Sequence, residues 1–147
     1  MHPADRWNIL VLALVIASLL LVGIVSGTVV RHLLQVVPAT ILMIVRLRYQ
    51  SSWWAASALA IHLFWSVIMV MIWLFLAGVA HVVTGRFTPA EVVLTGTIGV
   101  ASIFGCALAV RNLRLTSWRA SVTAFLIAAV TQIAAMWVSL QPAMATR

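Results

Sequence analysis

The sequence predicts an all-α integral membrane protein: a four-helix transmembrane bundle with a short interfacial or re-entrant segment after the first span. Of the 147 residues, 65% are apolar and only 7% are charged, and the mean hydropathy is +1.17. Such a chain lacks the polar surface that a water-soluble globule needs. Several apolar runs are long enough to cross the hydrocarbon core, and the segments between them are short. We therefore expect one membrane domain over residues 1–147, in contact with the lipid bilayer.

The first span is predicted over about residues 8–30, where NILVLALVIASLLLVGIVSGTVV follows Trp7. Its apolar run is longer than the roughly 7–15 residues typical of the apolar region of a signal peptide. No small-residue cleavage motif follows it. We therefore expect this segment to remain in the mature protein as a transmembrane helix.

The next segment, RHLLQVVPATILMIVRLR over residues 31–48, is harder to assign. Thirteen residues lie between His32 and Arg46, and Pro38 interrupts them. As a helix they cover only about 20 Å, which is less than the roughly 30 Å of hydrocarbon in a bilayer. We favour an interfacial or re-entrant segment. The alternative is that the first helix continues past a kink near Gly27 or Pro38.

The remaining spans are predicted over about residues 53–83, 89–110 and 120–140. The span that starts at Trp53 and Trp54 measures roughly 46 Å as a helix, so we expect it to tilt or to project from the bilayer. The basic loop RNLRLTSWR, residues 111–119, separates the last two spans.

The arginines predict the orientation of these four spans. The chain has nine arginines and no lysine. The arginines are spread along the chain, which is typical of residues at the membrane surface. They form no basic stripe of the kind that binds nucleic acid, so we expect no nucleic-acid partner. Three lie between the first and second spans, three lie between the third and fourth, and the other side holds the remaining three. We therefore expect a protein of the cell (inner) membrane, with the basic loops in the cytoplasm and both termini outside.

The stretch FTPAE contains Glu91, which besides Asp5 is the only acidic residue in the chain. Thr88, Pro89 and Glu91 fall at the N-cap, the first and the third helical positions of the third span. This spacing is typical of a capping box, in which the hydroxyl and the carboxylate each accept a backbone N–H. No second acidic residue is available for an acid–base pair. We predict a helix cap and no catalytic residues.

His62 lies about nine residues into the second span, where an ionisable residue is a functional candidate. Together with Trp65, Met69 and Trp73 it could bind haem or a quinone. A haem held by two histidines needs a second histidine at similar depth, and His81 is roughly 28 Å away along the same helix. We therefore favour a hydrogen-bonded packing role for His62, with haem or quinone as the alternative. The spacing of histidines, cysteine and acids predicts no metal site.

One face of the third span carries small residues at spacings of four, three, four and three: Thr95, Gly99, Ser102, Cys106 and Ala109. Small residues let another helix approach closely within a membrane. The face suits packing inside the bundle, or docking of a second copy or of another chain. Gln35, Thr131 and Gln132 could add hydrogen bonds between helices.

These features indicate a class of function and no more. The small size and the missing catalytic set favour a non-enzymatic accessory or structural subunit of a membrane assembly, either as a homo-oligomer or with a larger membrane-complex partner. A haem- or quinone-binding anchor that uses His62 is the alternative. A small transporter or channel is less favoured, because few polar residues lie deep in the spans.

Overall fold

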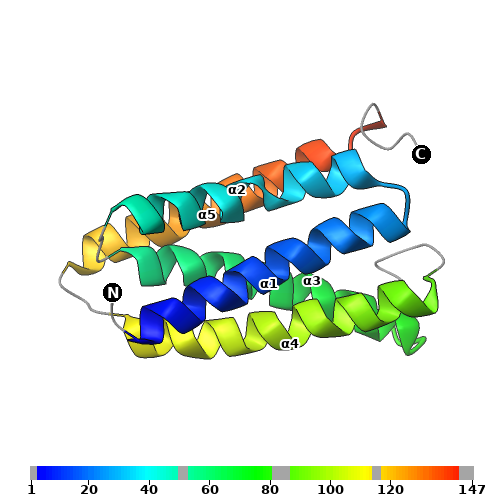
Figure 1. Ribbon diagram of the computed structural model, residues 1–147, viewed down its shortest axis with the longest axis horizontal. Coiled ribbons are helices and arrows are strands. Elements are labelled where there is room, and N and C mark those ends of the chain that lie inside the picture. The colour runs from blue at the N-terminus through cyan, green and yellow to red at the C-terminus, as the bar shows by residue number, and fades with distance from the viewer. Residues whose placement is uncertain (1–2, 50–52, 81–86, 114–116, 143–147) are drawn as a thin grey trace.

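The computed structural model describes residues 3–49, 53–80, 87–113 and 117–142. These residues form five helices: α1 (Pro3–Val25), α2 (Val29–Arg48), α3 (Trp54–Leu76), α4 (Pro89–Asn112) and α5 (Trp118–Ser139). The helices run alternately in opposite directions along one common axis (Figure 1). All five contain a stretch long and apolar enough to cross a membrane, which is consistent with an integral membrane protein.

The expected count of four spans is not confirmed, because the segment over residues 31–48 forms a helix of its own. α2 is continuous over 20 residues and includes Pro38. The count of thirteen residues between His32 and Arg46 understates the length of the helix, since it begins two residues before Arg31 and continues two residues beyond Arg46. The Arg46 side chain is also largely buried, so it does not mark the edge of the helix. Twenty helical residues cover about 30 Å, enough to cross the hydrocarbon core.

α1 and α3 each end just before a glycine, although the apolar sequence continues beyond that glycine. Gly27, with φ 69°, follows α1, and Gly78, with φ 71°, follows α3. In both turns the residue after the glycine donates its backbone N–H to the carbonyl five residues back, at 2.8 Å and 2.9 Å respectively. This is the Schellman ending, in which a residue without Cβ takes the left-handed conformation. α3 therefore ends at Leu76, whereas the predicted end at residue 83 lies outside the described residues.

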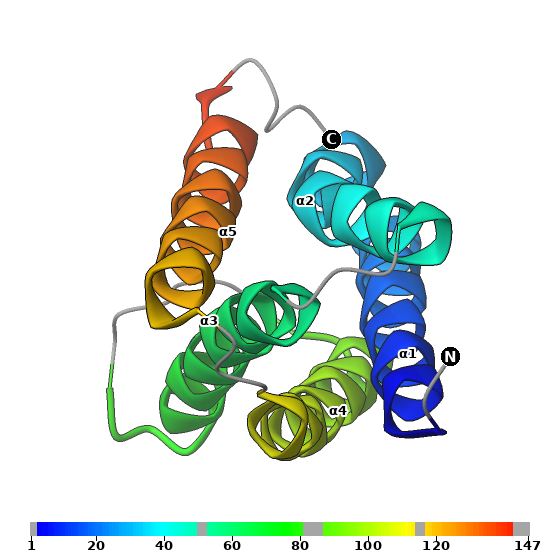
Figure 2. The same cartoon turned by 90° about the vertical axis from the view of Figure 1, so that its left-hand side faces the viewer.

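The five helices form a ring in which each helix has two principal neighbours. The order around the ring is α1, α2, α5, α3 and α4, and α4 packs back against α1; Figure 2 shows this order from one end of the bundle. Most of the buried apolar side chains come from α1, α2, α3 and α4. Among the described residues, α5 contributes only Ala128 to this buried set. α5 is therefore the helix least enclosed by the rest of the chain.

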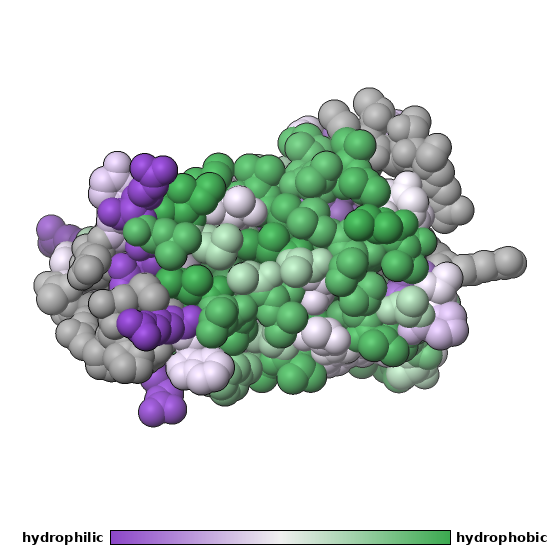
Figure 3. All heavy atoms as spheres, in the orientation of Figure 1, coloured by the Kyte–Doolittle hydropathy of each residue, from purple (hydrophilic) through white to green (hydrophobic). Residues whose placement is uncertain are grey.

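Hydrophilic side chains gather at the end of the bundle where α1 and α5 begin and where α2 and α4 end, at the left of Figures 1 and 3. We call this the basic end, because five described arginines belong to the helix turns there: Arg6, Arg46, Arg48, Arg111 and Arg119. Arg31, in the first turn of α2, belongs to the opposite end. Arg86, Arg114 and Arg147 lie outside the described residues.

An odd number of crossings places the two termini on opposite sides of the membrane. Reporter fusions check this, with a fluorescent protein that matures only in the cytoplasm and a phosphatase that is active only outside it. We expect one terminus to give fluorescence and the other to give phosphatase activity. Both termini reporting the same side would mean an even number of crossings, as the sequence-based expectation of four spans requires.

Candidate functional site

Glu91 lies in a capping box at the start of α4. Its carboxylate Oε2 accepts a hydrogen bond from the Thr88 amide at 2.6 Å, and the Thr88 hydroxyl accepts one from the Glu91 amide at 3.3 Å. Pro89 occupies the first helical position, where its missing N–H costs nothing. Arg86, a possible ion-pair partner, lies outside the described residues. The described contacts of Glu91 are those of a helix cap.

The small-residue face of α4 is occupied within the chain. Four of its five residues are buried: Thr95, Gly99, Ser102 and Ala109. The fifth, Cys106, is half-buried. A Cβ added at Gly99 would lie 2.3 Å from the ring of Trp73, and one added at Gly105 would lie 2.5 Å from the ring of His62. Rings from α3 therefore fill the space that the glycines leave. This arrangement supports internal packing and leaves no room for another chain at the same face.

His62 is fully buried where α3 faces α1 and α4. Its Nε2 donates to Oδ1 of Asn8, on α1, at 3.2 Å, and its ring lies against Gly105 of α4. Asn8 is itself fully buried, although its place at the edge of the apolar run did not single it out in the sequence. His62 Nδ1, Asn8 Nδ2 and Ser102 Oγ have no hydrogen-bond partner among the described residues. The histidine therefore contacts two neighbouring helices from α3, through Asn8 of α1 and Gly105 of α4.

The other side chains proposed for a haem or quinone site pack internally as well. Trp65 and Met69 are each only 2% exposed, and Trp73 covers Gly99. A haem ligand needs open space beside its coordinating nitrogen, whereas Nε2 of His62 is held by Asn8. These contacts describe internal packing, and haem or quinone binding at His62 stays a prediction.

Among the described residues, neither His32 nor Glu91 forms a cluster with His62. His32 Nδ1 lies 3.0 Å from the carbonyl of Thr28, and its ring packs on Gly23. His81 lies outside the described residues. Within the described ranges, no three His, Cys, Asp or Glu side chains come close enough to hold a metal ion.

A second polar joint links α2 to α5. Nε2 of Gln35 donates to Oγ of Ser139 at 2.9 Å, and Nε2 of Gln132 donates to the carbonyl of Gln35 at 3.0 Å. We call Gln35, Gln132 and Ser139 the glutamine clamp; all three side chains are buried. Thr131 instead bonds to carbonyls of its own helix, at 2.9 Å and 3.0 Å. The clamp fixes α5 to α2 near the end of the bundle opposite the basic end.

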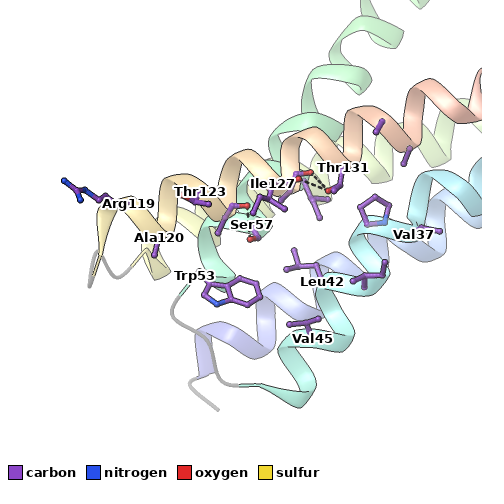
Figure 4. Close-up of a pocket in the computed structure, with 17 residues that line it drawn as sticks. Val37, Leu42, Val45, Trp53, Ser57, Arg119, Ala120, Thr123, Ile127 and Thr131 are labelled. Atoms are coloured by element: carbon purple, nitrogen blue, oxygen red, sulfur yellow. Dashed lines mark hydrogen bonds between the residues drawn. The ribbon is translucent and has the colours of Figure 1, made fainter.

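Between the clamp and the basic end, an open groove of about 800 Å³ lies between α2 and α5 with α3 beneath it (Figure 4). We call it the lateral groove. Residues 37–45 of α2 form one wall, residues 119–135 of α5 form the other, and Trp53, Ser57 and Ile61 form the floor. It is a feature of helix arrangement, and no single motif in the sequence points to it.

The lining of the lateral groove is mostly apolar. Ser57 Oγ donates to the carbonyl of Ala124 at 3.3 Å, which ties the floor to α5, and the Thr131 hydroxyl is bonded within its own helix. Arg119 is the one charged residue among the described lining residues, and it is exposed. Arg119 and Trp53 both lie at the end of the groove nearest the basic end (Figure 4). The groove thus combines an apolar interior with a cation at its mouth.

No protein-family model matches the chain, and neither a curated protein nor a solved structure matches it.

The contact between His62 and Gly105 predicts which glycine substitutions the bundle tolerates. Gly105→Ala should lower the free energy of unfolding by about 1–3 kcal/mol, because the added methyl overlaps the His62 ring. Gly96→Ala is the matched control on the same helix, since a Cβ there meets nothing within 4 Å, and it should cause no loss. Unfolding in mixed detergent micelles measures both values. Equal effects at the two positions would contradict the packing described for α3 and α4.

The glutamine clamp predicts a pattern of additivity. Gln35→Leu and Ser139→Ala should each cost about 0.6–1.7 kcal/mol of unfolding free energy. The double variant should lose less than the sum, because both changes remove the same hydrogen bond. Gln132→Leu should add fully to Gln35→Leu, because Gln132 bonds the main-chain carbonyl of residue 35. Full additivity in the first pair would show that the Gln35–Ser139 bond does not contribute.

Proposed function

We propose that the chain is a non-enzymatic accessory protein of the membrane that holds a hydrophobic membrane component in the lateral groove. The observation that carries the proposal is the groove itself. Its volume of about 800 Å³ falls within the roughly 300–1,000 Å³ of ligand sites, which are likewise mostly apolar with a few polar groups. The groove opens at the side of the bundle, so a component dissolved in the bilayer enters it without crossing water.

The hydrogen bonds made by the deeply buried polar side chains support a binding role for the protein over a catalytic role. His62 and Asn8 bond to each other inside the bundle, and Gln35 bonds to Ser139. These groups stabilise contacts between helices, and none of them lines the lateral groove. Polar groups within a membrane protein commonly serve helix association in this way.

The accessory role also requires a surface that can meet a partner. The small-residue face of α4 does not provide one, because α1 and α3 cover it. α5 is the least enclosed helix, and its buried apolar contribution is limited to Ala128. The lateral groove and the adjoining α5 are therefore the working surface of the protein on this proposal.

The basic end faces the cytoplasm in this proposal. The described arginines divide five to one in favour of that end, and cytoplasmic segments carry the excess of arginine in membrane proteins. With five crossings, α1 then begins in the cytoplasm and α5 ends outside the cell membrane. This orientation replaces the arrangement with both termini outside that four spans would have given.

Two neighbouring residues of α5 provide a test of the groove. Ile127 is 60% exposed and lines the groove, whereas Leu126 is 54% exposed and lies outside the lining. Ile127→Trp should fill the groove and displace its occupant, and Leu126→Trp should leave the occupant in place. Native mass spectrometry of protein extracted gently from its own membrane measures the mass retained per chain. Equal retention by the two variants, or no retained mass in the wild type, would contradict the proposal.

A further inference from the structure

The length and charge of the lateral groove indicate which membrane component it accepts. We infer that it binds one anionic phospholipid of the leaflet at the basic end, with acyl chains in the groove and the headgroup at its mouth. This inference rests on the proposed function and names the component. It is carried by three observations: the depth of the groove, the position of the arginines and the nature of the walls.

On its α2 and α3 sides, the lateral groove is about as deep as one leaflet. The lining of α2 extends from Val37 to Val45, and that of α3 extends from Trp53 to Ile61. Eight helical steps cover about 12 Å, close to the roughly 15 Å that is half of the hydrocarbon core. Only the α5 wall continues further, to Ala135. A transmembrane helix of a partner would need contacts over the full thickness, so an acyl chain fits the groove better.

Exposed arginines flank the mouth on both walls. Arg119 begins the α5 wall. On the other wall, Ile41 and Val45 line the groove, and Arg48 follows Val45 by three residues, which places it on the same face of α2. Arg48 and Arg119 are both exposed at the basic end. Arginine forks match the geometry of a phosphate group, so an anionic headgroup complements this mouth.

The groove walls suit the acyl chains of an anionic phospholipid, and the leaflet at the basic end supplies such lipids. Below the mouth, the hydroxyls of Ser57 and Thr131 are bonded to backbone carbonyls, so the interior offers acyl chains mainly carbon atoms. Trp53 lies on the floor near the mouth, where an indole ring suits the boundary between headgroups and hydrocarbon. Anionic lipids are concentrated in the cytoplasmic leaflet and attract arginines near the surface. The proposed orientation brings the mouth to that leaflet.

The test is a competition between two lipids with identical acyl chains. The purified full chain, in a non-ionic detergent, is mixed with equal amounts of phosphatidylglycerol and phosphatidylcholine, and native mass spectrometry measures the lipid retained. The wild type should retain one phosphatidylglycerol with a preference of about fivefold or more, the effect expected of one arginine near the headgroup. Arg119→Gln should remove most of the preference. Arg119→Lys keeps the positive charge but not the fork, so it should keep part of the preference.

Two control variants separate the groove from the rest of the basic end. Arg111→Gln removes an exposed arginine at the same end that does not line the groove, and it should keep the preference. Ile127→Trp should lose both lipids. Thermal unfolding checks that each variant is folded.

Each of the other outcomes overturns the inference in a recognisable way. Equal retention of the two lipids, with loss of both in Ile127→Trp, rejects the anionic headgroup and leaves the proposed function standing. An equal effect of Arg111→Gln and Arg119→Gln shows attraction to the whole basic end in place of a groove site. A dimer that disappears in Ile127→Trp assigns the groove to a second copy. Lipid retention unchanged in Ile127→Trp rejects the proposed function as well.

Discussion

The fold depends on the close approach of α3 to α4. In a bilayer, apolar side chains gain little by leaving lipid for protein, so helices associate through close packing and through hydrogen bonds between them. Here the rings of His62 and Trp73 lie directly over Gly105 and Gly99, where any side chain would collide with them. This contact fixes the distance between the two helices, and α1 then packs against α4 with Asn8 bonded to His62.

The other side of the ring is held in a different way. α5 contributes little buried apolar surface, and it is joined to α2 by the glutamine clamp and to α3 by the bond from Ser57 to the carbonyl of Ala124. Polar bonds at a few points hold two helices together without requiring side chains to interdigitate along their whole length. The lateral groove is the part of this seam that side chains do not fill. The groove exists because α5 buries few apolar side chains against α2 and α3, which also leaves α5 on the outside of the bundle.

The sequence was informative wherever a local rule determines the structure. Composition alone predicts a helical membrane protein, and the order of Thr88, Pro89 and Glu91 is enough to predict the cap of α4, which the structure contains. α2 was not predicted as a helix of spanning length because its ends carry arginines. Counting residues between charges assumes that every arginine lies outside the hydrocarbon. A long side chain allows the helix to continue past its charge. The ends at Gly27 and Gly78 were missed because a single glycine also occurs inside transmembrane helices.

The site was less predictable than the fold for a physical reason. A search for function in a membrane sequence starts from ionisable and aromatic residues within the spans, because placing them there is costly. In this chain that cost is offset by contacts with other helices, because His62, Trp65 and Trp73 pack inside the bundle. Below its mouth, the lateral groove is lined mainly by alanines and aliphatic residues, and the hydroxyls of Ser57 and Thr131 bond to backbone carbonyls. These residues are unremarkable one by one, and they form a binding surface only because α2 and α5 leave space between them. Its location depends on a tertiary bond between residues 35 and 139, which no local pattern in the sequence specifies.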